Sequence, residues 1–555
     1  MTAARQKVAV VTGGGGGIGG AVAEQFGREG WMVVTVDPLV TVDGSAALPE
    51  PPERTAARIT AAGGTARGSS ASVTDRDALR NLFNELADDH GGLDAVVNFA
   101  GINRPSGFTT GTEHDWSAVL SVHLGGYLNV LEAALPIMSA AGRGHILGVT
   151  SGAGWRAADA GAYACAKRAV AALTWQLGHC APDGVTVNAM SPIAETRMVA
   201  EAMERARRAA AAADRDAGAG GGTGGLSLLS LPVPDELGPI GAYLGGDPFG
   251  WCNGRVVFTN GSEVAFIEEP RLLEVMRTGD SPSLVGVLEA VVPGALSPAE
   301  ATQATTGGGN PRLGRLFDES EPATPQATVV RRCVVVSDRP ALASRVITAL
   351  EARSVACHAV ETGAGFRGAS ERLEAVAHAH GPLDAVIVAQ AGDDPVVTAS
   401  DADWQRVLAS HRGIVERIQS DACWARAAAD HAIGKDRSLR LVNLTDGRTP
   451  GGRSRAQAAA QLYRAAATST GGKVTAFAVS LEAAGGQADA AAAELVAYLI
   501  GSPDGSGLAG AELVVGPEWL GLRSHPRPAG TIVYGGPSVP VWLDRALRQI
   551  AGIRD

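Results

Sequence analysis

The chain has 555 residues, 45% of them apolar and 19% charged, which is long enough for more than one globular core. Its net charge is −11 and no segment concentrates basic residues, so we expect neither nucleic acid nor a membrane surface as a partner. No secretory signal or long apolar run is visible, and six cysteines are scattered without metal-ligand spacing. We therefore expect a cytoplasmic protein without a metal site.

Short β-branched segments alternate with helical stretches over the first 260 residues. The predicted strands are residues 8–11, 32–36, 95–98, 145–150, 185–190 and 256–259. Such nearly uninterrupted apolar runs are typical of a parallel sheet that helices cover on both faces. The pattern predicts the α/β class, with a doubly wound, Rossmann-like sheet.

The second half of the chain repeats the first. Residues 93–101 (LDAVVNFAG) return at 383–392 (LDAVIVAQAG), and three further blocks recur in the same order: Asp115-Trp116 with His123, the segment 185–191, and 242–244. We infer a tandem duplication with two Rossmann-like sheets. The predicted organisation is a catalytic domain at 1–304, a linker rich in Gly, Pro and Thr at 305–328, a second domain at 329–525 and a tail at 526–555.

Two segments outside this framework have open roles. The low-complexity insertion at residues 204–236 is either a disordered surface insertion or a mobile flap over the substrate. The tail ends in an amphipathic helix at residues 541–550, which we expect to cover the mouth of an active site.

A glycine-rich turn follows the first strand. Residues 12–19 read Thr-Gly-Gly-Gly-Gly-Gly-Ile-Gly and lead directly into a helix, an arrangement that brings backbone N–H groups and the helix N-terminus against a pyrophosphate. Strand two ends at Asp37, whose carboxylate can accept both ribose hydroxyls and would repel the extra phosphate of NADP. The sequence therefore predicts NAD(H) as the cofactor.

Tyr163 and Lys167 are four residues apart, so in a helix they lie on one face. An ammonium group beside a phenol, together with the charge of the nicotinamide, is expected to lower the tyrosine pKa and make it a usable acid/base. Ser151 follows a predicted strand and can hydrogen-bond the substrate oxygen. Thr150, one residue earlier, is the alternative.

Taken in order, these motifs resemble the short-chain dehydrogenase/reductase superfamily over roughly the first 260 residues. The resemblance implies a catalytic set of Ser151, Tyr163 and Lys167. It also implies a cofactor-binding set that includes Tyr163 and Lys167 together with Thr12, Gly13, Gly17, Ile18, Gly19, Asp37, Ser72, Val73, Asn98, Ala100, Gly101, Pro192, Ile193 and Thr196. Within the superfamily the chain is similar to the (3R)-hydroxyacyl-CoA dehydrogenase unit of peroxisomal multifunctional enzyme type 2.

Two positions depart from the family pattern. His123 stands where most members have an asparagine that kinks a helix and holds a proton-relay water, and Ile193 replaces the glycine of the usual Pro-Gly pair. A histidine can relay protons and can titrate near neutrality, so His123 is a candidate catalytic residue. It is otherwise a buried structural histidine, because His411 recurs in the second copy.

The second copy lacks the chemistry of the first. Its glycine loop reads Ser337-Asp-Arg-Pro-Ala-Leu-Ala343, Asp446 occupies the serine position, and Ala458 and Leu462 fall where tyrosine and lysine are expected. We predict that this copy is degenerate, binds no dinucleotide, and pairs with the first as an intramolecular pseudo-dimer. A homo-oligomer of such chains is also expected.

The predicted function is interconversion of a secondary alcohol and a ketone by tyrosine-assisted hydride transfer. The resemblance suggests a 3-hydroxyacyl or 3-oxoacyl thioester as the substrate. One alternative is a ketoreductase of polyketide or other secondary-metabolite biosynthesis. An alternative of another class is a non-catalytic dinucleotide-sensing or scaffold protein.

Overall fold

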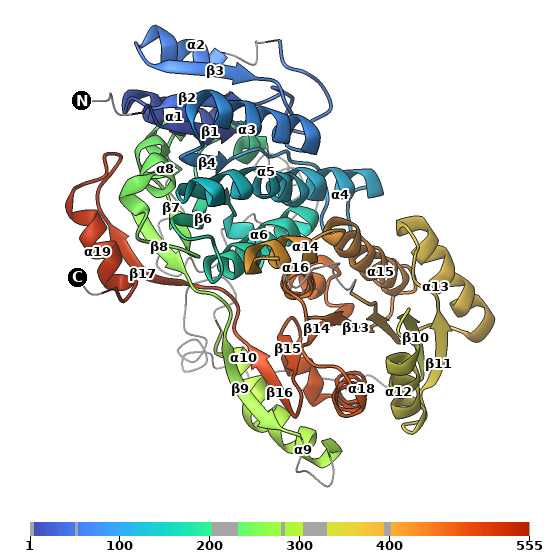
Figure 1. The fold of residues 1–555 in the computed structure, drawn as a ribbon. Helices are drawn as coiled ribbons and strands as arrows, with labels where there is room; N and C mark the ends of the chain where they lie inside the picture. The colour runs from blue at the N-terminus through green and yellow to red at the C-terminus, as the bar shows by residue number, and fades with distance from the viewer. Residues whose placement is uncertain are drawn as a thin grey trace.

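The computed structural model describes residues 5–49, 54–201, 231–278, 284–303, 330–392 and 401–553. The predicted linker at 305–328 and residues 204–230 of the predicted insertion lie outside these ranges. Figure 1 shows two α/β halves, the first in blue to green and the second in yellow to red. This arrangement confirms the predicted fold class.

The first half is built on a nine-stranded sheet in the order β17-β8-β7-β6-β5-β4-β1-β2-β3. Its strands are β1 (Val8–Thr12), β2 (Met32–Val36), β3 (Thr65–Ser69), β4 (Ala95–Asn98), β5 (Gly144–Val149), β6 (Val185–Pro192), β7 (Val256–Thr259), β8 (Glu263–Ile267) and β17 (Pro528–Val533). All six predicted strands are present. The sequence did not predict β3, whose side chains are polar or small and partly exposed.

Helices cover both faces of this sheet. In chain order they are α1 (Gly17–Arg28), α2 (Arg54–Ala61), α3 (Arg76–His90), α4 (Glu113–Leu120), the π-helical turn η1 (Ser121–Gly125), α5 (Gly126–Ala141), η2 (Gly152–Gly154), α6 (Gly161–Gly178), η3 (Pro234–Leu237), α8 (Gly238–Gly245) and η4 (Asp247–Phe249). Val8 and Val10 of β1 pack toward α3, α5 and α6, whereas Ala9 and Val11 pack toward α1 and α8. This alternation explains why the strand is apolar throughout.

The second half has an eight-stranded sheet in the order β11-β10-β12-β13-β14-β15-β16-β9. Its strands are β9 (Leu272–Arg277), β10 (Arg332–Ser337), β11 (Ala356–Val360), β12 (Ala385–Ala389), β13 (Leu439–Asp446), β14 (Val474–Leu481), β15 (Glu512–Val515) and β16 (Trp519–Arg523). The six strands from β11 to β15 follow the same order as β2-β1-β4-β5-β6-β7 of the first half. The duplication read from the sequence is therefore present in the topology.

The remaining helices belong to the second half, except for the last. They are α9 (Leu284–Val291), η5 (Val292–Leu296), α10 (Ser297–Ala301), α12 (Pro340–Glu351), α13 (Phe366–His380), α14 (Asp403–Ser410), α15 (Ile414–Gly434), α16 (Pro450–Tyr463), α17 (Ala466–Ser469), α18 (Gly486–Gly501), η6 (Asp504–Leu508) and α19 (Trp542–Ile550).

The two halves exchange a strand, which the sequence did not predict. β9 precedes the second half in the chain but pairs antiparallel with β16, and β17 follows the second half but pairs antiparallel with β8 of the first (Figure 1). The boundaries placed at residues 304 and 526 therefore do not match the sheets. The tail helix α19 buries Leu543 and Leu547 in the core of the first half, and it lies against α8 instead of over a cavity mouth.

The halves meet through equivalent helices, α6 of the first and α16 of the second, which lie side by side at the centre of the molecule (Figure 1). Both helices are rich in alanine and almost entirely buried, so their backbones approach closely. Arg168 on α6 is fully buried and donates to Oε1 of Gln457 on α16 at 2.7 Å. One continuous apolar core runs through both helices.

Two helical stretches have the length and mean hydropathy of a membrane span, contrary to the expectation from sequence. Residues 113–141 form one of them, and 61% of its most apolar 18-residue segment is buried inside the protein. Residues 284–301 form the other, with 17% buried, and its residues Leu288, Val292 and Leu296 pack into the core of the second half.

Candidate active site

A cavity of about 1500 Å³ opens at the carboxyl ends of the central strands of the first half. Parallel strands and their following loops place functional groups at this edge of such a sheet. Most of the predicted site residues line it: Gly13, Gly17, Ile18, Gly19, Asp37, Ser72, Val73, Ala100, Gly101, His123, Ser151, Tyr163, Lys167, Pro192, Ile193 and Thr196.

Two predicted cofactor-binding residues lie behind the cavity wall. The Thr12 hydroxyl donates to Oδ1 of Asn98 at 2.6 Å and accepts from the amide of Ala100 at 3.4 Å. Both Thr12 and Asn98 are buried. These residues tie β1 to the end of β4 and thereby position the loop that lines the cavity.

The glycine-rich turn has the shape that a pyrophosphate needs. Gly13 has a φ of +66° and a Cβ there would lie 2.6 Å from the carbonyl carbon of Phe99, so no larger residue fits. Gly17, with a φ of +56°, faces open space and begins α1. No side chain caps the N-terminus of α1, which leaves its N–H groups and positive dipole end to the cavity.

The far end of the cavity carries one acidic and one basic residue. Asp37 at the end of β2 accepts from the amides of Gly15 at 3.0 Å and Leu39 at 2.7 Å, which fixes its carboxylate. Arg54 at the start of α2 donates from Nε to the Gly15 carbonyl at 2.6 Å. The sequence did not identify Arg54 as a site residue, because it follows Asp37 only after a long loop.

Ser151, Tyr163 and Lys167 come together at the other end. Ser151 follows β5, and its hydroxyl lies close enough to the phenol of Tyr163, near the start of α6, to oppose the rise that burial causes in the pKa of that tyrosine. Lys167 lies one helical turn on, with Nζ 5.7 Å from the centre of the Tyr163 ring and 2.6 Å from the Val149 carbonyl, to which it donates. The three residues thus form the set expected from their spacing.

Burial sets the proton affinities of these groups. It lowers the pKa of Lys167 to about 7, because an ammonium ion is costly to desolvate. It raises the pKa of Tyr163, and the nearby Ser151 hydroxyl opposes this shift. The predicted lowering of the tyrosine pKa is therefore wrong for the protein alone and would depend on the charge of a bound oxidised nicotinamide.

The alternative serine substitute, Thr150, has a different role. Its side chain is buried, and its hydroxyl donates to the main-chain carbonyl of Lys167 at 2.7 Å. This bond attaches the end of β5 to α6. Thr150 therefore does not take the place of Ser151 beside the Tyr163 phenol.

His123 lies in the π-helical turn η1 and packs edge-on against Tyr163, with ring centres 4.9 Å apart. Its Nε2 is 2.7 Å from the carbonyl oxygen of Ile102, and its buried Nδ1 has no hydrogen-bond partner in the described part of the chain. Burial, with the charge of Lys167, lowers its pKa to about 3. The expectation that it titrates near neutrality is therefore wrong.

Gly101 makes room for this ring, because a Cβ there would lie 2.5 Å from Cε1 of His123. In the second half, His411 instead uses Nδ1 on the Val407 carbonyl and Nε2 on the Ser454 hydroxyl, each at or below 2.8 Å. The two histidines therefore occupy equivalent positions but make different contacts.

At the corresponding place in the second half, the described side chains make contacts of their own. Asp338 accepts from the Ala391 amide at 2.7 Å in place of the glycine turn. Asp446 pairs with Arg448 at 2.5 Å, and Ala458 and Leu462 are buried against α6. These contacts are consistent with the predicted loss of dinucleotide binding.

Comparisons with known proteins show which family the chain belongs to. Residues 7–207 match the short chain dehydrogenase family. The chain is 36% identical to the short-chain reductase protein NovJ of Streptomyces niveus over 207 residues, which are 37% of this chain and 76% of that protein. The chain belongs to the short-chain dehydrogenase/reductase family.

Two further similar proteins match one or both halves of the chain. Acetoacetyl-CoA reductase of Cupriavidus necator is 28% identical over 260 residues, 46% of this chain and 97% of that protein. The NADP-bound N-domain of a bacterial malonyl-CoA reductase matches both halves, with a TM-score of 0.65 over 92% of this chain and 97% of that one, at 16% identity. That likeness supports the two-sheet fold.

The second half of this short-chain dehydrogenase holds the loops around its active site. Gln461 on α16 donates to the carbonyls of Ala153 and Arg156 at 2.9 and 2.7 Å. Arg426 on α15 donates to carbonyls in the loop at residues 107–111, including that of Phe108 at 2.7 Å. Both loops flank α6, so the degenerate half fixes the catalytic one.

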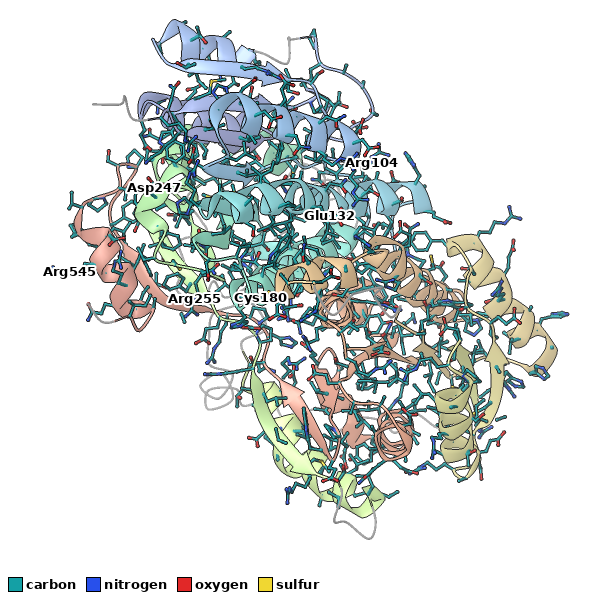
Figure 2. The ribbon with its side chains drawn as sticks, in the orientation of Figure 1. Arg104, Glu132, Cys180, Asp247, Arg255 and Arg545 are labelled. Carbon is teal, nitrogen blue, oxygen red and sulfur yellow. The ribbon has the colours of Figure 1, made fainter. Side chains whose placement is uncertain are left out.

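Arg104 and Arg156 also line the cavity, and the sequence analysis did not identify either of them. Arg104, labelled in Figure 2 near α4, donates to the Asp43 carbonyl at 2.6 Å and pairs with Asp115 at 3.5 Å. Arg156 follows Ser151 by five residues and lines the same cavity. Neither lies in a motif, so only the fold shows that they face the cavity.

Of the predicted insertion, Leu231 and Pro234 are described and line the cavity, and the Pro232 carbonyl accepts from the amide of Glu195 at 2.8 Å. The role of the whole insertion as a flap stays a prediction.

Proposed function

We propose that the protein is an NAD(H)-dependent oxidoreductase that interconverts a secondary alcohol and a ketone. The observation that carries this proposal is the convergence of Ser151, Tyr163 and Lys167 at one end of a cavity whose other end is the glycine-rich turn. A dinucleotide that spans this cavity would supply a hydride acceptor or donor at the nicotinamide.

The chain's own groups have distinct roles in the proposal. Tyr163 exchanges a proton with the substrate oxygen, and Ser151, whose hydroxyl lies beside the phenol, orients that oxygen. Lys167 supplies positive charge beneath the tyrosine ring and holds the end of β5 through the Val149 carbonyl. His123, neutral and buried beside Tyr163, offers Nδ1 as an acceptor for a relayed proton.

The preference for NAD(H) rests on Asp37. Its carboxylate is fixed at the end of β2 and lines the cavity, where it would accept ribose hydroxyls and repel a 2′-phosphate. Arg54 at the same end favours the opposite choice, because a guanidinium can pair with that phosphate. Titration with both nucleotides decides between them, and tighter binding of NADPH than NADH would reverse the assignment.

The substrate class draws on the relatives. Acetoacetyl-CoA reductases and a 3-oxoacyl-acyl-carrier-protein reductase are among the similar proteins. We therefore propose a 3-hydroxyacyl or 3-oxoacyl compound. A ketoreductase of secondary metabolism would use the same three residues and would turn over a free ketone as fast as its thioester.

A cytoplasmic location and a homo-oligomer are also part of the proposal. The first is supported by six cysteines that are all free thiols. Sedimentation of the full chain would test the second.

The decisive experiment compares wild type with Tyr163→Phe on a panel of alcohols and ketones with NAD(H). We expect turnover to fall at least about 1000-fold while NADH binding, followed by fluorescence, stays unchanged. Equal rates for the two proteins on every substrate, with NADH still bound, would instead identify a dinucleotide sensor.

A further inference from the structure

Arg156 is a cation inside the catalytic end of the cavity. It lies on the loop between β5 and α6, five residues after Ser151 and seven before Tyr163, and it lines the cavity together with them. A Cβ on Gly152 would lie 3.1 Å from its Nε, so the guanidinium lies directly over the residue next to the catalytic serine.

No counter-ion of this guanidinium lies among the described residues. Its Nε is buried and makes no hydrogen bond, and no ion pair of Arg156 occurs within the described ranges. The nearest acid along the chain, Asp159, is turned away and accepts from the Phe108 amide at 2.8 Å and the Ser469 hydroxyl at 2.7 Å. The guanidinium carbon lies over the indole of Trp155, 5.9 Å from the ring centre.

Such an arrangement costs free energy unless something compensates for it. An arginine removed from water without a partner loses hydration, and burial indeed lowers the pKa of Arg156. Arg104, another arginine that lines the cavity, pairs with Asp115. Arg156 differs in offering a planar, multi-donor group to whatever fills the cavity.

The position of Arg156 is fixed from the second half. Its main-chain carbonyl accepts from Gln461 at 2.7 Å, and the carbonyl of Trp155 accepts from Arg464 at 3.1 Å. The loop is therefore held at both residues before any ligand binds. Preorganisation of this kind is typical of a residue that recognises a charged group.

We propose that the substrate carries a carboxylate close to its reacting carbon and that Arg156 binds this carboxylate. The proposal rests on the proposed function and narrows its substrate class to an oxo acid and the corresponding hydroxy acid. A carboxylate matches the fork of the guanidinium, and its placement next to Ser151 would fix which carbonyl meets Tyr163.

The test uses matched substrates that differ only in charge: acetoacetate and levulinate, each against its methyl ester. Wild type should favour at least one acid over its ester by about 10- to 100-fold in kcat/KM, the loss typical of one charge-assisted contact. Arg156→Gln should abolish that preference through a loss of kcat/KM for the acid, and Arg156→Lys should restore part of it. Arg104→Gln is the matched control and should change acid and ester alike.

Isothermal titration of the NADH-loaded protein with acetoacetate and levulinate gives a readout that does not need turnover. Binding of an acid by wild type and by Tyr163→Phe, with its loss in Arg156→Gln, supports the proposal even if no panel substrate reacts. Equal binding of acids and esters, or an Arg156→Gln protein that keeps the acid preference, overturns it. Absence of NADH binding would overturn the proposed function instead.

Discussion

The side-chain amide of Gln461 donates a hydrogen bond of 2.7 Å to the main-chain carbonyl of Arg156. One residue belongs to the half without catalytic groups and the other to the wall of the active-site cavity. The degenerate copy therefore contributes to the site through its contacts with loops, and its retention needs no chemistry of its own.

This contact predicts an effect of Gln461→Met on substrate binding. Loss of the donor leaves two carbonyls, those of Ala153 and Arg156, without a partner, at a cost of about 1–3 kcal/mol. We expect the KM for substrate to rise several-fold while NADH affinity stays constant. Gln419→Met removes another contact between the halves, the hydrogen bond to the Glu113 carbonyl. This variant should leave the KM for substrate and the NADH affinity unchanged. A selective loss of NADH affinity would contradict the assignment.

Ser151 and Thr150 should differ sharply when each hydroxyl is removed. Ser151→Ala is expected to lower kcat by about 100-fold or more without a change in the denaturation midpoint, because its hydroxyl meets the Tyr163 phenol. Thr150→Val should lower the denaturation midpoint, because its hydroxyl supports the Lys167 carbonyl from a buried position. Rate assays and urea titrations of both variants test this, and the reverse pattern would mean that Thr150 contacts the substrate.

Lys167 predicts a pH dependence of stability in the cofactor-free protein. Its folded pKa, about 7, lies below that of an unfolded lysine, so above pH 7 the unfolded chain binds one more proton than the native one. Stability should then rise as pH increases from about 7 toward about 10, by at most about 1.4 kcal/mol per pH unit. Urea unfolding at several pH values should show that Lys167→Met lacks this rise.

The half-exposed Lys435, which pairs with Glu374 at 3.2 Å, provides the matched control. Lys435→Met should keep the slope of the wild type. An identical slope in Lys167→Met and wild type would show that the lysine stays charged when buried.

Asp37 predicts the direction of a cofactor switch. Asp37→Ser removes the negative charge but keeps an acceptor for a backbone amide, and Arg54 remains beside Gly15. We expect the ratio of kcat/KM for NAD to that for NADP to fall at least about 10-fold. Adding Arg54→Ala to Asp37→Ser should raise the ratio of kcat/KM for NAD to that for NADP part of the way back to its wild-type value. A ratio that does not move would place the 2′-hydroxyl elsewhere.

The tail helix α19 predicts a contrast between neighbouring positions. Leu543 is fully buried in the core of the first half, whereas Val541 is 99% exposed. Leu543→Ala should cost about 2–5 kcal/mol, and Val541→Ala about 0.5 kcal/mol or less. Chemical denaturation, monitored through the loss of NADH binding, measures the free energy of unfolding of both variants. A small effect of Leu543→Ala would mean that the tail is dispensable to the first half.

Local patterns were sufficient for most of the fold. The six predicted strands are apolar on both faces, and the glycine turn and the Tyr163–Lys167 spacing each encode a local geometry. The strand exchange was invisible because β9 and β17 carry partly exposed side chains without the apolar signature of the interior strands. Their partners lie more than 200 residues away, a separation that no local pattern encodes.

The residues of the candidate site also divide into those that a local pattern reveals and those that only the tertiary fold brings to the cavity. Residues within motifs were found, whereas Arg54, Arg104 and Arg156 lie in connecting segments and reach the cavity only through the tertiary fold. The sequence did not predict the raised pKa of Tyr163 in the protein alone or the strongly lowered pKa of His123, because spacing reveals nearby charges but not the extent of burial. Desolvation is the largest cause of the pKa shift at both residues, and at His123 the charge of Lys167 acts in the same direction.

The pairing of β17 with β8 also constrains biosynthesis. As the chain leaves the ribosome, the catalytic sheet lacks its edge strand until residue 533 has emerged, after the entire inert copy. An exposed edge on β8 during that interval could recruit strands from other nascent chains. Rapid folding of the following copy, which brings the tail back, would limit this exposure.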